Sequence, residues 1–161
     1  MEAFKSAAGL REDDLTTRFA AELVRRKPDQ LGRLDLSAVY APLIRQSMQR
    51  GKPQEALDWL EQARSLGPAS SRATFDTWRA EILSRTNRPE EASRIYDELV
   101  SSSASSPQVA LDAAETLLDN GHFDQARDFL GRALKLARSA RVPWVEDMAN
   151  HHLKSLSRKH E

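Results

Sequence analysis

The stretch NGHFDQARDFLGRALKLAR, residues 120–138, is the third occurrence of one pattern in this chain. The first occurrence is RGKPQEALDWLEQARSLGP, residues 50–68, and the second is TNRPEEASRIYDELVSSS, residues 86–103. Each copy begins at a turn residue and continues into a segment with apolar residues at helical spacing. A pattern that recurs at a nearly constant interval predicts a repeat protein, in which every copy forms one structural unit.

The turn residue of each copy is Gly51, Asn87 or Gly121. Glycine and asparagine are the residues that most readily adopt the left-handed conformation that ends a helix. An alanine follows five positions later and leaves room for a neighbouring helix. Larger apolar residues or further alanines come four and then three positions on, so all three positions share one stripe. The alanines nearest to the turns are Ala56, Ala92 and Ala126, which sets the period at 36 and then 34 residues.

A second helix is predicted before each turn. Apolar residues at i, i+3, i+4 and i+7 precede Gly51 and Gly121, and a looser version of the pattern precedes Asn87. Serine is a favourable N-cap, so we expect these helices to begin at Ser37, Ser71 and Ser106. Alanine and leucine are abundant, with 22 and 20 residues, against 6 valines and 3 isoleucines. This composition also favours an all-α protein.

The arrangement resembles the tetratricopeptide repeat family, over about two-thirds of the chain. Residues 37–70 depart from the family pattern at Ile44 and Ser47, and residues 107–140 lack the family's aromatic residue and terminal proline. Most of the other small and apolar positions agree with the pattern in all three copies. The resemblance implies a right-handed superhelical array of antiparallel helix hairpins, a TPR-like α-solenoid. The matching residues are Tyr40, Leu43, Ala56, Leu60, Ala63 and Pro68; Ala80, Leu83, Ala92 and Tyr96; and Ala113, Ala114, Leu117, Ala126, Leu130 and Ala133.

Three regions follow from this reading. Residues 1–36 are an N-terminal helix and linker, either half of a degenerate repeat or the remnant of a longer array. Residues 37–140 contain three repeats, and residues 141–161 contain a C-terminal capping helix, which such arrays need, and a tail. The three repeats span residues 37–70, 73–106 and 107–140.

The resemblance also implies a concave groove lined by the first helix of each repeat. The groove would be apolar and basic at its first repeat and acidic at its third, which suits a peptide or helix with a cationic segment. Trp78 belongs either to this groove or to the core, because the register of the second repeat is the least regular. The candidate groove residues are Arg45, Met48, Gln49, Trp78, Glu81, Arg85, Gln108, Asp112, Glu115 and Asp119.

Motifs for catalysis, cofactors or metals are not found. The sequence lacks cysteine and the common nucleotide-binding, zinc-protease and serine-hydrolase motifs. His151 and His152 are adjacent, so on a helix they point about 100° apart and are expected to be one packed and one solvent-facing residue. The 24 basic and 24 acidic residues cancel, which disfavours nucleic-acid binding. Without a long apolar run or a secretory leader, we expect a cytoplasmic protein with no membrane contact and no cofactor.

These observations favour a non-catalytic scaffold that binds a partner protein or peptide. Two alternatives stay open at this point. The chain could associate with itself, because the N-terminal helix is expected to be exposed and the end repeats are degenerate. It could also be a regulatory or scaffolding domain of a larger protein or enzyme.

Overall fold

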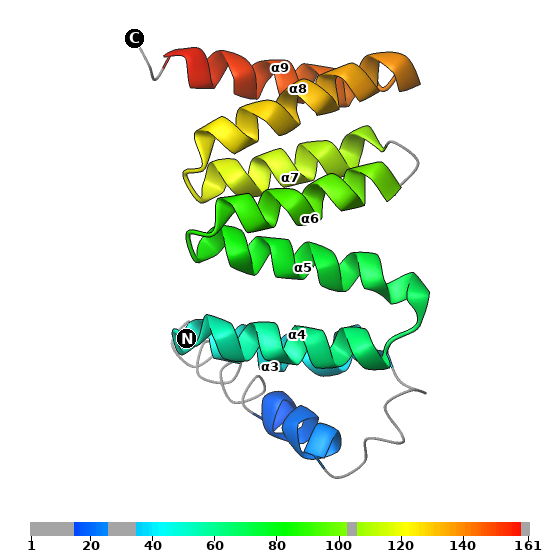
Figure 1. The fold of residues 1–161 in the computed structure, drawn as a ribbon, viewed down its shortest axis with the longest axis vertical. Coiled ribbons are helices and arrows are strands. Elements are labelled where there is room, and N and C mark those ends of the chain that lie inside the picture. The colour runs from blue at the N-terminus through cyan, green and yellow to red at the C-terminus, as the bar shows by residue number, and fades with distance from the viewer. Residues whose placement is uncertain (1–14, 26–34, 103–105, 159–161) are drawn as a thin grey trace, which may run out of the picture. The chain divides into compact units, whose positions relative to one another are not determined.

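A computed structural model describes residues 15–25, 35–102 and 106–158 of the chain, and within these ranges the regular structure is entirely helical (Figure 1). The prediction of an all-α fold is therefore confirmed. Residues 15–25 are helical. The other helices are α3 (Leu36–Gln49), α4 (Pro53–Leu66), the 3-10 helix η1 (Ala69–Ser71), α5 (Arg72–Arg85), α6 (Pro89–Ser102), α7 (Pro107–Asp119), α8 (Phe123–Ala140) and α9 (Pro143–Arg158).

The chain divides into two compact units, Met1–Phe75 and Asp76–Glu161. In the first unit, helices α3 and α4 pack against each other through apolar residues spaced at helical intervals. Tyr40 and Leu43 of α3 and Ala56 and Leu60 of α4 are all buried. The start of α3 differs from the sequence prediction: Asp35, not Ser37, is the N-cap, and its carboxylate accepts the Ser37 N–H at 2.9 Å.

The predicted turn residues all have the left-handed backbone conformation, with φ of +68° at Gly51, +59° at Asn87 and +81° at Gly121. In each turn the next N–H donates to the carbonyl five residues earlier, which satisfies an otherwise unpaired carbonyl at the helix end. This recurrence confirms that the sequence repeat is also a repeat of backbone geometry. The three bonds run from Lys52 N to Ser47 O, from Arg88 N to Leu83 O and from His122 N to Leu117 O, each at 2.9 Å.

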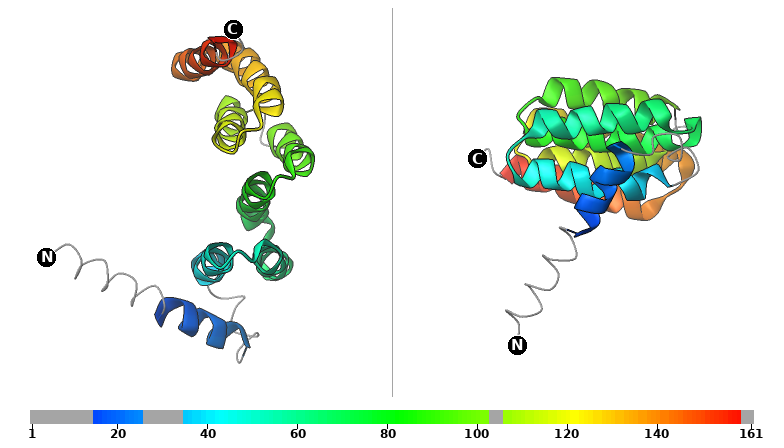
Figure 2. Two further views of the ribbon diagram at one scale, coloured as in Figure 1. Left: turned by 90° about the vertical axis from the view of Figure 1, so that its left-hand side faces the viewer. Right: turned by 90° about the horizontal axis from the view of Figure 1, so that it is seen from below.

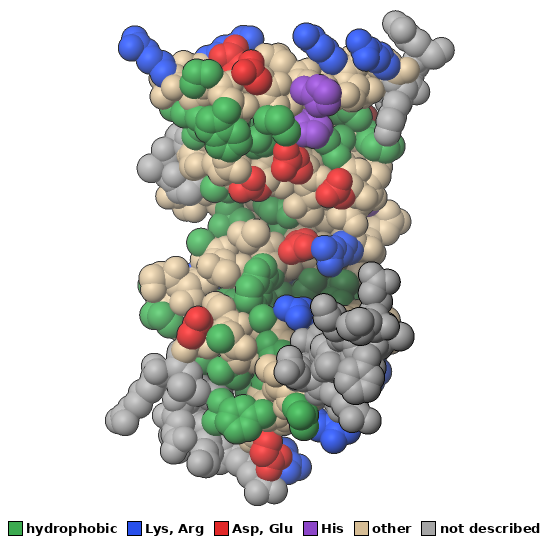
Figure 3. Space-filling model, turned by 180° about the vertical axis from the view of Figure 1, so that it is seen from behind, with side chains coloured by type: hydrophobic (Ala, Val, Ile, Leu, Met, Phe, Trp, Pro, Cys, Tyr) green, Lys and Arg blue, Asp and Glu red, His purple; other side chains and the backbone are tan. Residues whose placement is uncertain are grey.

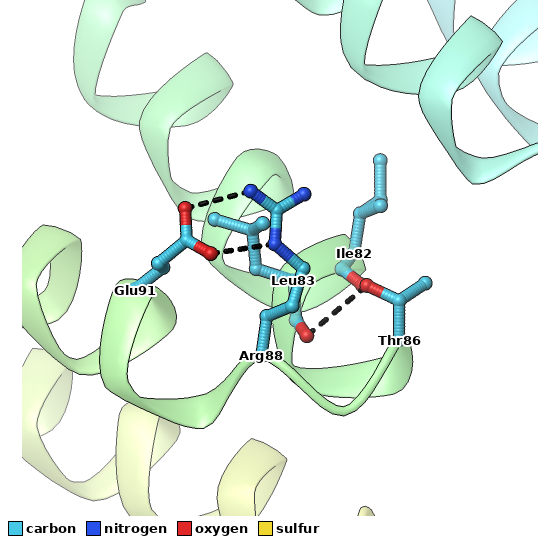
Figure 4. Close-up of polar contacts among 5 residues, drawn as sticks. All are labelled: Ile82, Leu83, Thr86, Arg88 and Glu91. Atoms are coloured by element: carbon cyan, nitrogen blue, oxygen red, sulfur yellow. Dashed lines mark hydrogen bonds and ion pairs between the residues drawn. The ribbon is translucent and has the colours of Figure 1, made fainter.

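Side chains reinforce the turn between α5 and α6 (Figure 4). The Thr86 hydroxyl donates to the Ile82 carbonyl at 2.8 Å. The Arg88 guanidinium donates to both carboxylate oxygens of Glu91, with distances of 2.6 Å and 2.7 Å. The hydrogen bond from Arg88 lowers the pKa of the Glu91 carboxyl group. These contacts hold the end of α5 and the first turn of α6.

The second unit has a core built largely from alanines. Helix α8 packs against both α7 and α9, and α7 also contacts α6 and α9. Because alanine side chains are small, helices α7 and α8 can approach closely. Two tight turns reverse the chain, so α9 runs in the same direction as α7 (Figures 1 and 2). The buried residues of these three helices include Ala110, Ala113, Ala114 and Leu117; Ala126, Leu130 and Ala133; and Val145, Ala149 and Leu156.

Candidate functional site

The candidate residues of the first unit all lie on α3. Arg45 and Gln49 are exposed, and Met48 is half-buried. Ser47, between them in sequence, is buried. One side of the helix therefore presents a cation, an amide and a thioether.

The candidate residues of α5 carry balanced charge. Glu81 and Arg85 are one helical turn apart and form an ion pair of 2.6 Å between Oε1 and Nη2. Trp78 is half-buried, a burial that is compatible with either of the two interpretations of this residue. The charges of Glu81 and Arg85 therefore offset each other on the surface of α5.

A buried tyrosine on α6 lies within electrostatic range of candidate residues from two other helices. The pKa of the Tyr96 hydroxyl is raised to about 12, mainly by burial. The charges of Glu81 and Asp112 act in the same direction, and a hydrogen bond with Thr116 and the charge of Arg85 oppose them. The Tyr96 ring packs edge-on against Phe129 of α8, with 5.9 Å between ring centroids. The structure thus brings Glu81, Arg85 and Asp112 near one point in the second unit.

Helix α7 presents a row of carboxylates. Asp112, Glu115 and Asp119 are spaced three and four residues apart and so share one face of the helix. Gln108, a turn before Asp112, donates from Nε2 to Asp112 Oδ1 at 2.5 Å. Like charges at this spacing repel one another slightly, so the row favours a nearby cation.

A pocket of about 330 Å³ lies at the end of this row, where α7 and the start of α8 meet α9. Glu115 Oε1 and His152 Nε2 are 3.2 Å apart across it. Two carboxylates and three apolar side chains contribute, and none of the lining residues is Lys or Arg. The lining residues are Glu115, Leu118, Asp119, Phe123, His152, Ser155 and Leu156.

The sequence prediction missed the contribution of α9 to this pocket. His151 and His152 were expected to be one packed and one solvent-facing residue, and Ser155 had no assigned role. The signal was the helical spacing of Trp144, Met148 and His152, which are four residues apart and share one side of α9. That side is the one that meets α7, because His152 contacts Glu115.

The same side of α9 exposes two large apolar side chains. Trp144 is 52% exposed and Met148 is 40% exposed. They precede His152 along α9, as Asp112 precedes Glu115 along the parallel helix α7. We define the α7–α9 face as Asp112, Glu115 and Asp119 of α7 together with Trp144, Met148 and His152 of α9. Figure 3 shows apolar, acidic and histidine side chains side by side on the upper part of the surface in view.

In a comparison with known families, residues 107–132 match the model of the tetratricopeptide repeat. These 26 residues are similar to one tetratricopeptide repeat. The matched residues cover α7 and the first part of α8, including Asp112, Glu115 and Asp119 of the α7–α9 face. No curated protein and no solved structure matches the chain. Tetratricopeptide repeats generally mediate protein–protein interactions and are typically non-catalytic.

Within residues 15–25, 35–102 and 106–158, no group of three or more histidine or acidic side chains is placed to hold a metal ion. Over the same part of the chain, no helix has the length and hydrophobicity needed to cross a membrane.

Proposed function

We propose that this protein is a non-catalytic interaction module that binds a cationic segment of a partner protein on its α7–α9 face. The observation that supports this most strongly is the pocket of about 330 Å³, whose lining combines Glu115 and Asp119 with Leu118, Phe123 and Leu156. A pocket with both apolar and acidic walls matches the chemistry of lysine and arginine side chains.

A basic side chain would contact both the apolar and the acidic walls of this pocket. Lysine and arginine have apolar stems that pack on hydrophobic surface and charged heads that stay hydrated or paired. In the pocket, the stem would lie against Leu118 and Phe123 while the head reaches Glu115 or Asp119. Complementary charge would speed association and select the partner more than it would add affinity.

The length of the face suits a helical or extended peptide. Asp112, Glu115 and Asp119 follow one side of α7 through two helical turns. Trp144 and Met148 add exposed apolar surface beside the first part of this row. Aromatic side chains and methionine are favourable components of protein interfaces. A partner segment with basic and apolar residues on one side would therefore contact both helices.

Three of the remaining candidate residues, all in the second unit, enter the proposal as secondary contacts: Trp78, Glu81 and Gln108. The cation Arg85 and the first-unit residues Arg45, Met48 and Gln49 have no part in it. Because Glu81 is already paired with Arg85, a cation gains less there than at the unbalanced row on α7. Alanine substitution of Trp78, Glu81 or Gln108 is expected to weaken binding less than neutralising the carboxylates of the α7–α9 face.

The test uses the full chain and two labelled helical peptides with the same leucine spacing. One peptide carries lysine and the other carries glutamate at the remaining positions. Fluorescence anisotropy should show binding of the lysine peptide only, weakening as salt is added. The triple variant Asp112→Asn, Glu115→Gln, Asp119→Asn should bind the lysine peptide at least about tenfold more weakly, a change of about 1.4 kcal/mol.

A matched control neutralises three exposed carboxylates outside the α7–α9 face: Glu61→Gln, Glu98→Gln and Asp128→Asn. This variant has the same net charge as the first triple variant and should bind like the original chain. Equal loss of binding in both triple variants would mean that only net charge matters. Equal binding of the two peptides would reject a cation-selective site.

A further inference from the structure

The helix at residues 15–25 has two opposite faces of different character. Thr17, Ala20 and Val24 are buried on one face. On the other face, Leu15 is 64% exposed and Phe19 is 70% exposed. These two residues are one helical turn apart, so they form a short apolar stripe. A solvent-facing leucine and phenylalanine in register indicate a surface that a partner can cover.

Basic residues lie beside this stripe. Arg18 and Arg25 are seven residues apart and therefore fall on one side of the helix, adjacent to Leu15 and Phe19. Both arginines are exposed. The Arg25 guanidinium also contacts Glu22 at 3.1 Å, an exposed pair of the kind that contributes little to stability. Glu22 lies on the same side, four residues after Arg18 and three before Arg25, so the helix presents an apolar stripe next to a charged stripe with a net charge of +1.

The α7–α9 face has the complementary arrangement. Its apolar stripe is Trp144 and Met148 on α9, and its parallel acidic stripe is the row of carboxylates on α7. The lengths also agree. Eleven helical residues span about 16 Å at about 1.5 Å per residue, and the twelve residues of α7 from Gln108 to Asp119 span about 18 Å.

We propose that residues 15–25 of one copy dock on the α7–α9 face of a second copy, so that the protein associates with itself. This inference rests on the face described under the proposed function and names one occupant for it. Leu15 and Phe19 pack on Trp144 and Met148, and Arg18 and Arg25 approach the carboxylates of α7. The mode is a helix lying along a groove with apolar anchors one turn apart.

The two surfaces are different parts of the chain, so the contact is heterologous. Such contacts build open chains of copies unless the geometry closes them into a ring or a mutual exchange. Occupation by a second copy would also compete with an outside cationic partner. A cationic peptide is therefore expected to dissociate the assembly.

Sedimentation equilibrium of the full chain, from about 5 to 300 µM, tests association directly, since this range brackets affinities of about 7 to 5 kcal/mol. The mean mass should rise with concentration for the original chain. Phe19→Ser should weaken association at least about tenfold, as expected for removal of an aromatic anchor. Leu66→Ser, at another exposed leucine of the first unit, should leave the association unchanged. Far-ultraviolet circular dichroism checks that both variants remain folded.

A mixing experiment makes the test specific. Phe19→Ser disables the docking helix at residues 15–25 and leaves the α7–α9 face intact. The double variant Glu115→Lys, Asp119→Lys disables the α7–α9 face and leaves the docking helix intact. Each variant alone should be monomeric, whereas an equimolar mixture should form a dimer. A purely monomeric original chain, or a mixture that stays monomeric, would overturn the inference. Binding of the lysine peptide by a monomeric chain would overturn self-association and leave the proposed function standing.

Discussion

Glu115 on α7 and His152 on α9 lie 3.2 Å apart, between Oε1 and Nε2. This contact joins a helix of the matched tetratricopeptide repeat to the last helix of the chain. Helix α9 therefore packs against α8 and also contacts α7 through a polar side chain. The residue spacing that packs Val145, Ala149 and Leu156 inward also aligns Trp144, Met148 and His152 beside the carboxylates of α7.

We expect Glu115→Gln to lower the free energy of unfolding by less than about 1 kcal/mol, because partly exposed ion pairs contribute about that much at most. Glutamine can still accept a hydrogen bond from His152, so the α7–α9 contact is retained. Urea titration followed by circular dichroism measures the change. A loss of several kcal/mol would show that the pair supports the packing of α9. The affinities measured for variants of Glu115 would then have to be corrected for the fraction of chain that is unfolded.

Ala126→Trp should destabilise the second unit by roughly 1–3 kcal/mol, the usual cost of inserting a large side chain into a packed core. Ala126 is fully buried on α8. The matched control is Ala140→Trp, at the exposed end of the same helix, which should leave stability nearly unchanged. Thermal unfolding of the two variants compares them, and equal melting temperatures would contradict the close packing of α7 on α8.

Local features of the fold were predictable from the sequence because they depend on neighbouring residues. Gly51, Asn87 and Gly121 have positive φ as expected. Helices α4, α6, α7 and α9 all begin at a proline, a residue suited to the first helical position. The N-cap of α3 was misplaced by two residues, since both Asp35 and Ser37 are good capping residues. Only the geometry shows that the Asp35 carboxylate accepts the Ser37 N–H.

The site was less predictable, because it depends on contacts between residues far apart in sequence. The acidic row of α7 followed from the resemblance, which assigns Asp112, Glu115 and Asp119 to one helix surface. The pocket did not, because the orientation of α9 about its own axis is set by packing against α8. That orientation brings His152 and Ser155 to α7. Tyr96 was assigned to the core and is buried, but its proximity to charged residues of α5 and α7 required the coordinates.

Arg141→Gly should raise the free energy of unfolding by about 0.5–1 kcal/mol. Arg141 caps α8 with φ of +56°, a left-handed conformation that glycine adopts without the steric cost of a Cβ atom. Gly121→Ala should do the opposite by about 1 kcal/mol, since Gly121 has φ of +81°. Chemical denaturation measures both changes. Destabilisation by Arg141→Gly would indicate that the arginine side chain contributes contacts that outweigh the backbone strain.

Between pH 9 and 11, the free energy of unfolding of the Tyr96→Phe variant should decrease less with rising pH than that of the original chain. Because burial raises the pKa of Tyr96 from 10.0 to about 12, the folded state holds the phenol proton more tightly than the unfolded chain. The stabilisation is full below pH 10 and is lost as the pH rises toward 12, with a total of roughly 1–3 kcal/mol. Denaturant titrations at pH 9, 10 and 11 compare the variant with the original chain. Parallel stability curves over this range would contradict the burial of the hydroxyl.

Hydrogen–deuterium exchange of the full chain, with and without the lysine peptide, tests most directly whether the α7–α9 face is the binding surface. Bound peptide is predicted to slow amide exchange in α7 and α9 together, at residues 107–119 and 143–158. The triple variant Asp112→Asn, Glu115→Gln, Asp119→Asn should lose this protection. Protection confined to other helices while the peptide is fully bound would contradict the assignment of the face.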